Sequence, residues 1–281
     1  MKKILLLGFF LVLIALSNAY AIFDDYEPGV RARAMGGAFI AAGDDANAIF
    51  YNPAALKLSK NNIMTSYTKL FGLDFAVLKT ASFCYNFRKY GNVALSIETF
   101  DVEYEGFSLM NEGTYSLAHS FLLIGDVHSQ FYLGYSANLH HLSFEKFGNE
   151  NCFSLNLGAL AVLHQRTRIA FTVHRINNPS IGKERDFDLP QKMTIGLAYN
   201  PYDGVITELD LEKKFGEDTE LHIGIEAKII KHLYIRMGAK NLPTSLSAGF
   251  GVEVKGIIVD YAYQHHSVLN GTHHFGVGYK F

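Results

Sequence analysis

The chain has 281 residues, a formal net charge of −2 and 14% aromatic residues. So mild a charge provides no basic surface for nucleic acid. The length permits one large domain or two small ones, and with only six prolines no segment resembles a linker. The sequence contains no nucleophile elbow, zinc-protease, phosphate-loop or dinucleotide-binding motif, so we expect neither an enzyme nor a bound cofactor.

The first 21 residues are predicted to be a signal peptide that is removed after export. Lys2 and Lys3 precede the apolar run Ile4–Leu16, and Ala19-Tyr20-Ala21 supplies the small residues of a cleavage site. The alternative is a membrane-anchoring helix, but such a helix needs roughly 18 or more apolar residues. We therefore expect Sec-type export and cleavage after Ala21.

Residues 22–60 are rich in alanine and glycine, with nine alanines between positions 32 and 55. Asp44 or Asp45 is a candidate N-cap of a short helix that ends near Phe50. Asn52 is a second candidate N-cap, because Pro53 would then occupy the first helical position. The segment is too short for a domain, so it either fills the interior of the following structure or forms a tail in the periplasm.

From about residue 61 onward, apolar side chains alternate with polar or small ones, as in residues 221–229. This period of two predicts β-strands with one apolar and one polar face. Runs of about ten residues suit tilted transmembrane strands and are long for a sandwich. We predict an all-β fold, a single 14-stranded antiparallel transmembrane β-barrel over residues 61–281. The predicted strands are 61–70, 75–88, 91–104, 112–124, 129–145, 151–163, 166–176, 190–199, 204–214, 219–229, 232–240, 244–254, 257–265 and 271–281.

The connections between these runs alternate in length. Short ones, such as Ile230-Lys231, follow the even-numbered runs, and longer ones, such as Glu105–Asn111 and Asn177–Leu189, follow the odd-numbered runs. Outer-membrane barrels have short periplasmic turns and longer extracellular loops. The last strand alternates aromatic residues with glycine and ends at Phe281, similar to the signal read by the outer-membrane barrel assembly machinery. These features predict a bacterial outer-membrane location with membrane lipids around the wall.

The N-terminal segment carries a resemblance to a known family. The runs 29–38 and 41–46, followed by Asn52-Pro53-Ala54-Ala55-Leu56, resemble the start of the PorV/PorQ family, which belongs with the FadL-like (long-chain fatty acid transporter) superfamily. The resemblance implies an N-terminal hatch inside a fourteen-stranded barrel, with the hatch motif at Asn52, Pro53 and Ala54. The remaining hatch residues that it implies are Gly36, Gly37, Asp44 and Asp45.

Charged side chains of the hatch and apolar side chains at inward-facing strand positions are candidates for contacts inside the barrel. Arg31 and Arg33 of the hatch are candidates for pairing with carboxylates of the wall. Six apolar inward positions either contact a hydrophobic ligand in the lumen or pack against the alanine-rich hatch. They are Leu122, Leu160, Val162, Ile176, Ile206 and Ile258.

The cysteines and histidines predict no metal centre. The sequence does not show whether Cys84 and Cys152 pair, and neither lies at zinc-ligand spacing. Adjacent residues of a strand face opposite sides, so at most two of the histidines around the last loop can converge. Those histidines are His265, His266, His273 and His274.

Three functions remain open at this stage. The first is transport of hydrophobic small molecules across the outer membrane, which the FadL-like resemblance implies. The second is a PorV/PorQ-like role in type IX protein secretion or surface assembly, with secretion-system components as partners. The third is a structural or diffusion barrel.

Overall fold

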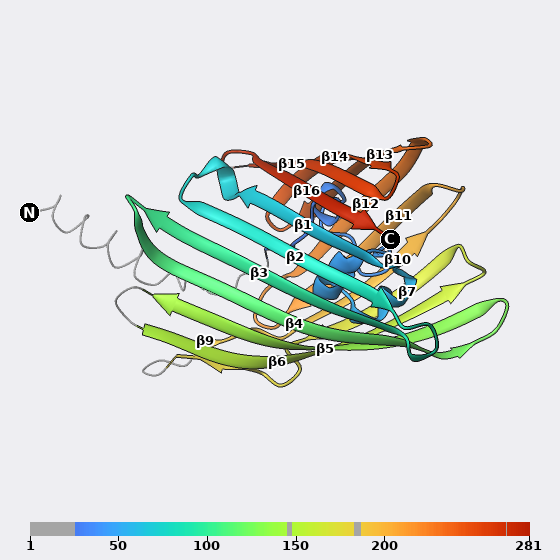
Figure 1. Ribbon diagram of the computed structural model, residues 1–281, viewed down its shortest axis with the longest axis horizontal. Coiled ribbons are helices and arrows are strands. Elements are labelled where there is room, and N and C mark those ends of the chain that lie inside the picture. Colours follow the sequence, from blue (N-terminus) through green and yellow to red (C-terminus); the bar gives the residue numbers. More distant parts are fainter. Residues whose placement is uncertain (1–25, 145–147, 183–186, 268) are drawn as a thin grey trace, which may run out of the picture.

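A computed structural model describes residues 26–144, 148–182, 187–267 and 269–281. The predicted signal peptide lies outside the described residues. Fourteen strands of the described chain close into one antiparallel barrel, in which each strand pairs with its sequence neighbours and β1 pairs with β16 (Figure 1). The barrel strands are β1 (Asn62–Lys69), β2 (Ala76–Asn86), β3 (Asn92–Tyr104), β4 (Phe107–Gly125), β5 (Ser129–Phe144), β6 (Gly148–Leu163), β7 (Thr167–His174), β10 (Lys192–Tyr199), β11 (Val205–Lys214), β12 (Thr219–Ile230), β13 (Leu233–Asn241), β14 (Thr244–Val254), β15 (Ile257–His266) and β16 (Thr272–Lys280).

The predicted fold is confirmed, since each predicted run overlaps one barrel strand. The predicted loop Glu105–Asn111 is wrong. Glu105 and Gly106 form a two-residue turn with φ of 50° and 83°, and the residues after it pair with β3. A two-residue hairpin with positive φ at both positions matches the twist of the strands, so the ladder continues to the turn. As a result β3 to β6, of 13 to 19 residues, extend beyond the other strands at one end of the barrel (Figure 1).

The predicted long connection Asn177–Leu189 contains a small hairpin of β8 (Ser180–Ile181) and β9 (Phe187–Asp188). Ile181 and Leu189 pack against Leu142 of β5 in a small buried cluster. This connection therefore folds back onto the extended part of the wall.

The outer face of the barrel is apolar, as the alternation predicts. In β12, Ile223 and Ile225 are 47% and 41% exposed, whereas His222 before them and Glu226 after them are buried. The same pattern runs around the barrel. Lipid offers no hydrogen bonds, so a membrane-spanning sheet must pair all its backbone groups by closing and must present apolar side chains outward. No helix of the described residues is long and apolar enough to cross a membrane.

The N-terminal segment, residues 26–60, lies inside the barrel (blue in Figure 1). It contains helix α2 (Val30–Ala34) and the 3-10 helices η1 (Ala46–Phe50) and η2 (Pro53–Leu58). Asp45, rather than Asp44, caps η1 by accepting a hydrogen bond from the Asn47 N–H at 2.9 Å. Two further 3-10 turns, η3 (Leu70–Gly72) and η4 (Arg88–Tyr90), lie in strand connections.

The cysteines of the wall are both free thiols. Cys84 is fully buried in the cluster that joins the N-terminal segment to the wall. At the chain end, the Phe281 N–H donates to the Asn61 carbonyl at 3.0 Å, so the last residue lies beside the start of β1.

Candidate functional site: the barrel interior around the N-terminal segment

Glycines of the wall allow the backbone of the N-terminal segment to lie directly on the strands. A Cβ atom at Gly238 would stand 2.0 Å from the Met35 carbonyl carbon, and one at Gly134 would stand 2.4 Å from the Ala54 nitrogen. Neither contact is compatible with any side chain. The small inward-facing residues therefore make room for the N-terminal segment.

The Asn-Pro-Ala motif connects two parts of the N-terminal segment to the wall. The Asn52 side chain is fully buried, and its Oδ1 accepts a hydrogen bond from the Ala54 N–H at 2.9 Å. Its Nδ2 donates to the carbonyls of Ile40 at 2.9 Å and Ala159 of β6 at 3.3 Å. Asn52 is thus the N-cap that the sequence predicts and also a cross-link to β6.

Two buried carboxylates of β11 hold four successive backbone N–H groups of the N-terminal segment. Asp210 accepts from Phe39 and Ile40 at 2.9 and 3.3 Å, and Glu208 accepts from Ala41 and Ala42 at 2.6 and 2.8 Å. Alternation places both carboxylates inside the barrel. The alternation does not indicate that their partners are backbone N–H groups about 170 positions earlier, so this role of the two carboxylates cannot be predicted from the sequence.

Arg31 is at the centre of an ion-pair network between the N-terminal segment and the wall. Its guanidinium donates twice to Glu226 of β12 at 2.8 Å and contacts Asp44 at 2.5 Å. The predicted pairing of Arg31 with a wall carboxylate is confirmed. Arg33 differs, because its ion pair is with Glu27 of the N-terminal segment itself, at 2.7 Å.

Glu27 is a second electrostatic anchor. Lys240 of β13 pairs with its carboxylate at 2.7 Å, in addition to Arg33. Burial alone would raise the pKa of Glu27, but Lys240, Arg33 and His222 outweigh it and hold the pKa at about 2. Glu27 is therefore ionised at neutral pH and ties the start of the N-terminal segment to the wall.

The structure places most of the predicted site residues at the interface between the N-terminal segment and the wall. Gly36 and Gly37 have φ of 69° and 85°, and the Gly36 carbonyl accepts from His222 Nδ1 at 2.8 Å. Two of the six apolar candidates lie apart from this interface. Leu122 is 46% exposed beside a register shift in the β4–β5 pairing, and Ile176 is 40% exposed just after the end of β7. The other four apolar candidates are buried in one cluster with the N-terminal segment: Leu160, Val162, Ile206 and Ile258.

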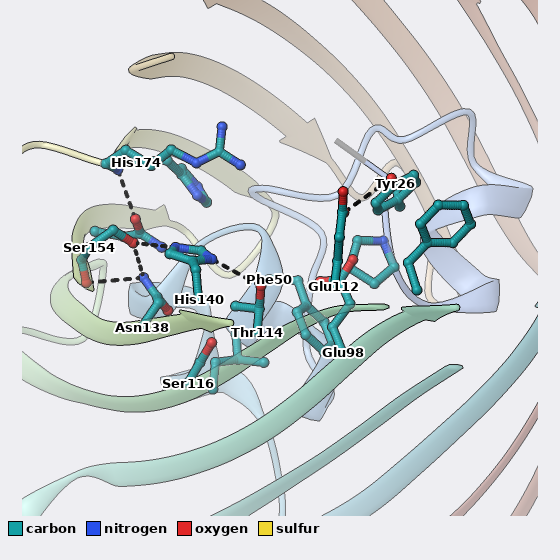
Figure 2. Close-up of a pocket in the computed structure, with 15 residues that line it drawn as sticks. Tyr26, Phe50, Glu98, Glu112, Thr114, Ser116, Asn138, His140, Ser154 and His174 are labelled. Atoms are coloured by element: carbon teal, nitrogen blue, oxygen red, sulfur yellow. Dashed lines mark hydrogen bonds between the residues drawn. The ribbon is translucent and has the colours of Figure 1, made fainter. Parts of the chain in front are cut away.

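A cavity of about 80 Å³ lies between the N-terminal segment and strands β3 to β7 (Figure 2). Part of its lining is apolar and aromatic, from Tyr26, Ile49, Phe50 and Phe100. The remaining lining is mostly polar. It includes Glu98, Glu112, Ser116, Asn138, His140 and Arg175.

An apolar groove of about 350 Å³ lies on the outer, lipid-facing side of the wall at β4 to β7. Gly134 and Gly158 lie at its floor, and the Asn-Pro-Ala motif lies directly behind them. Backbone without side chains is therefore all that separates this groove from Asn52 and Pro53.

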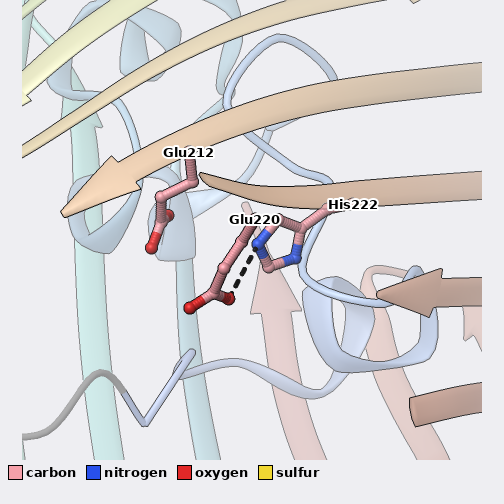
Figure 3. Close-up of side chains that lie close together, drawn as sticks. All are labelled: Glu212, Glu220 and His222. Carbon is pink, nitrogen blue, oxygen red and sulfur yellow. Dashed lines mark ion pairs between the residues drawn. The ribbon is translucent and has the colours of Figure 1, made fainter. Parts of the chain in front are cut away.

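One group of described residues has the geometry of a cation site: Glu212, Glu220 and His222 (Figure 3). Lysines already face both carboxylates, with Lys192 at 3.3 Å from Glu212 and Lys214 at 3.7 Å from Glu220. We describe this group as an ion-pair cluster, because a divalent ion would enter a site already neutralised by lysines.

The histidines around the last loop do not converge. His274 is buried and bonds Thr68 at 3.0 Å, His273 faces outward and bonds Tyr261 at 2.7 Å, and the His266 ring accepts from the Leu269 N–H at 3.0 Å.

A closed barrel with an apolar outer face and a buried N-terminal segment defines the class as a transmembrane β-barrel of the bacterial outer-membrane type. No protein-family model and no curated protein sequence matches the chain. Solved structures of FadL-type channels share its fold. CymD, a monoaromatic hydrocarbon channel, is 13% identical with a TM-score of 0.64, over 90% of this chain and 97% of its own.

Two further structures show the same similarity. The toluene transporter TodX of Pseudomonas putida is 11% identical with a TM-score of 0.61, over 92% of this chain and 99% of its own. A FadL homologue of Pseudomonas aeruginosa is 12% identical with a TM-score of 0.54, over 89% and 95%. The fold is thus FadL-like, and none of these structures is a PorV or PorQ protein.

Proposed function

We propose that this protein moves hydrophobic small molecules across the bacterial outer membrane, with residues 26–60 acting as a hatch in the barrel. The observation that carries the proposal is the hatch itself. It is buried against the wall, yet polar contacts that can be broken singly hold it at Asn52, Glu208 and Asp210. The structural neighbours named as a monoaromatic hydrocarbon channel and a toluene transporter support the same class of cargo.

The two hollows at the hatch suggest where such a molecule travels. The cavity of Figure 2 and the lipid-facing groove both border β6, where Asn156 lines the cavity and Gly158, two residues further on, lines the groove. We infer that a molecule passes from the cavity to the groove when the hatch moves away from this part of the wall. The groove is apolar, so it suits a hydrophobic molecule that continues into the lipid.

The test is uptake by vesicles that contain the purified barrel, with toluene as the probe. Saturable uptake above that of empty vesicles is expected, and its absence would remove the proposal. Ala159→Phe fills the groove from the outer face of β6 and should slow uptake. Ala161→Phe, on the same face of the same strand but outside the groove, is the matched control.

A second candidate is a PorV/PorQ-like role in type IX secretion or surface assembly. It rests on the similarity of residues 29–56 to the start of that family. Affinity purification from native outer membranes should then recover secretion components or cargo, and recovery of assembly machinery alone would count against it. Assembly through the aromatic last strand and Phe281 is expected under either function.

A further inference from the structure

The cavity of Figure 2 has a mostly polar lining, unlike the apolar groove on the outer face of the wall. Its volume of 80 Å³ is about half that of a cavity known to enclose benzene, which is roughly 150 Å³. A long acyl chain cannot fit in this space, whereas a single polar group or the edge of a small ring can. The lining groups therefore decide which end of a molecule is accepted.

One wall of the cavity is a chain of hydrogen bonds across three strands (Figure 2). His140 of β5 bonds Thr114 at 3.0 Å and Ser154 at 2.8 Å, and Asn138 donates through Nδ2 to Ser154 at 3.1 Å. This arrangement holds the Asn138 amide in one orientation and leaves its carbonyl oxygen as an acceptor. The hydroxyl of Ser116, the cross-strand neighbour of Asn138 in β4, has no hydrogen-bond partner among the described residues. The Asn138 carbonyl oxygen can accept a hydrogen bond from the hydroxyl of a ligand, and the Ser116 hydroxyl can donate one to it or accept one from it.

The other end of the cavity combines carboxylates with aromatic rings. Glu112 is 2% exposed and accepts a hydrogen bond from the Tyr26 hydroxyl at 3.2 Å. The Tyr26 ring packs on Phe100 with centroids 4.7 Å apart, and Phe50 lines the same cavity. A flat apolar ring would find contacts here next to strong hydrogen-bond acceptors.

Charges of both signs line the cavity. Glu98 and Glu112 come from β3 and β4, and Arg175 follows β7. A charged ligand of either sign would meet a like charge, whereas a neutral hydroxyl can donate to a carboxylate or accept from a guanidinium. A pure hydrocarbon would leave the polar groups without the water that solvates them, and a site built to bond a hydroxyl discriminates against the analogue that lacks it.

We propose that this cavity selects small neutral molecules that carry a hydroxyl group on an aromatic ring, of the phenol type, over the corresponding hydrocarbons. The inference rests on the proposed transport function for its biological role, but the binding itself does not depend on transport. The hydroxyl would reach the polar wall, and the edge of the ring that carries it would lie against Phe50 and the Tyr26–Phe100 pair.

The test compares phenol and toluene as probes on the full-length barrel. Calorimetric titration into barrel-containing nanodiscs, corrected with empty nanodiscs, should give at least tenfold tighter binding of phenol. Ser116→Ala should weaken phenol binding about three- to tenfold, the loss expected for one neutral hydrogen bond, and leave toluene unchanged. Asn138→Leu should shift the preference toward toluene.

Ser96→Ala is the matched control, because Ser96 of β3 is the cross-strand partner of Ser116 and does not line the cavity. Equal affinity for the two probes, or identical phenol affinity in Ser116→Ala and Ser96→Ala barrels that retain heat-modifiable gel mobility, would overturn the inference. Phenol binding without vesicle uptake of either probe would instead remove the proposed transport and leave the cavity assignment standing. Saturable toluene uptake together with equal affinities would remove only the cavity assignment.

Discussion

Replacement of Glu208 by leucine should release the hatch from β11. The Glu208 carboxylate accepts from the N–H groups of Ala41 and Ala42 at 2.6 and 2.8 Å, and all three residues are buried. A leucine of similar size keeps water out, so neither N–H finds another acceptor. Each orphaned group costs about 1–3 kcal/mol, giving roughly 2–6 kcal/mol for the pair. The variant no longer buries a charged carboxylate, and the desolvation free energy saved in this way offsets part of the cost. We therefore expect the free energy of hatch opening to fall by about 2 kcal/mol.

Cys84 reports on this change, because its thiol is fully buried in the cluster that the hatch covers. In a Cys152→Ser background, a thiol reagent can label Cys84 only when the hatch opens. A loss of about 2 kcal/mol should accelerate labelling roughly 30-fold, since every 1.4 kcal/mol is a factor of ten. The rate is measured on the folded barrel by mass spectrometry.

Glu253→Leu provides the control, because this carboxylate pairs with Lys280 of the wall at 2.7 Å and not with the hatch backbone. It should leave Cys84 labelling near the starting rate. A Glu208→Leu rate within about threefold of the control would refute the reasoning that these two hydrogen bonds hold the hatch.

Four further predictions follow from the same interface. Asn52→Ala removes an N-cap and the two hydrogen bonds that Nδ2 donates, so it should lower the free energy of hatch opening by about 2–4 kcal/mol. Loss of a cap alone would cost roughly 0.5–2 kcal/mol. The same Cys84 labelling measures the difference. Gly238→Ala brings a Cβ within 2.0 Å of Met35 and should prevent seating of the hatch, seen as rapid labelling of Cys84 in a barrel that still folds. The pKa of Glu27 is depressed to about 2, so its ion pairs stabilise the seated hatch fully above the ordinary glutamate pKa, and this stabilisation is lost as the pH falls toward 2. Hatch opening in the wild type should therefore accelerate between about pH 4.5 and 2. Glu27→Gln should abolish that part of the pH dependence. Deletion of residues 29–58 should raise planar-bilayer conductance while the barrel still assembles, and an unchanged conductance would contradict a plug.

The strands and caps of this protein could be predicted from the sequence because their causes are local. Alternation of side chains along β12 and β14 gives each strand one apolar and one polar face without reference to any distant residue, whereas closure of the barrel decides which of the two faces meets lipid. Asn52 followed by Pro53 marks the start of η2 for the same reason, because the cap oxygen and its N–H are two residues apart. The number of strands and the position of most turns follow from these signals.

The tertiary structure alone decides which wall groups the hatch meets. Glu208 and Asp210 are predictable as inward-facing charges, yet their partners are backbone groups about 170 residues earlier, which carry no sequence signature. Arg33 forms its ion pair with Glu27 of the hatch rather than with a carboxylate of the wall. β4 begins at Phe107, directly after the turn of Glu105 and Gly106, because a two-residue turn is compatible with the twist of the strands. Contacts between remote segments depend on barrel closure and register, so the cavity and its polar lining exist only once the fourteen strands have closed around residues 26–60.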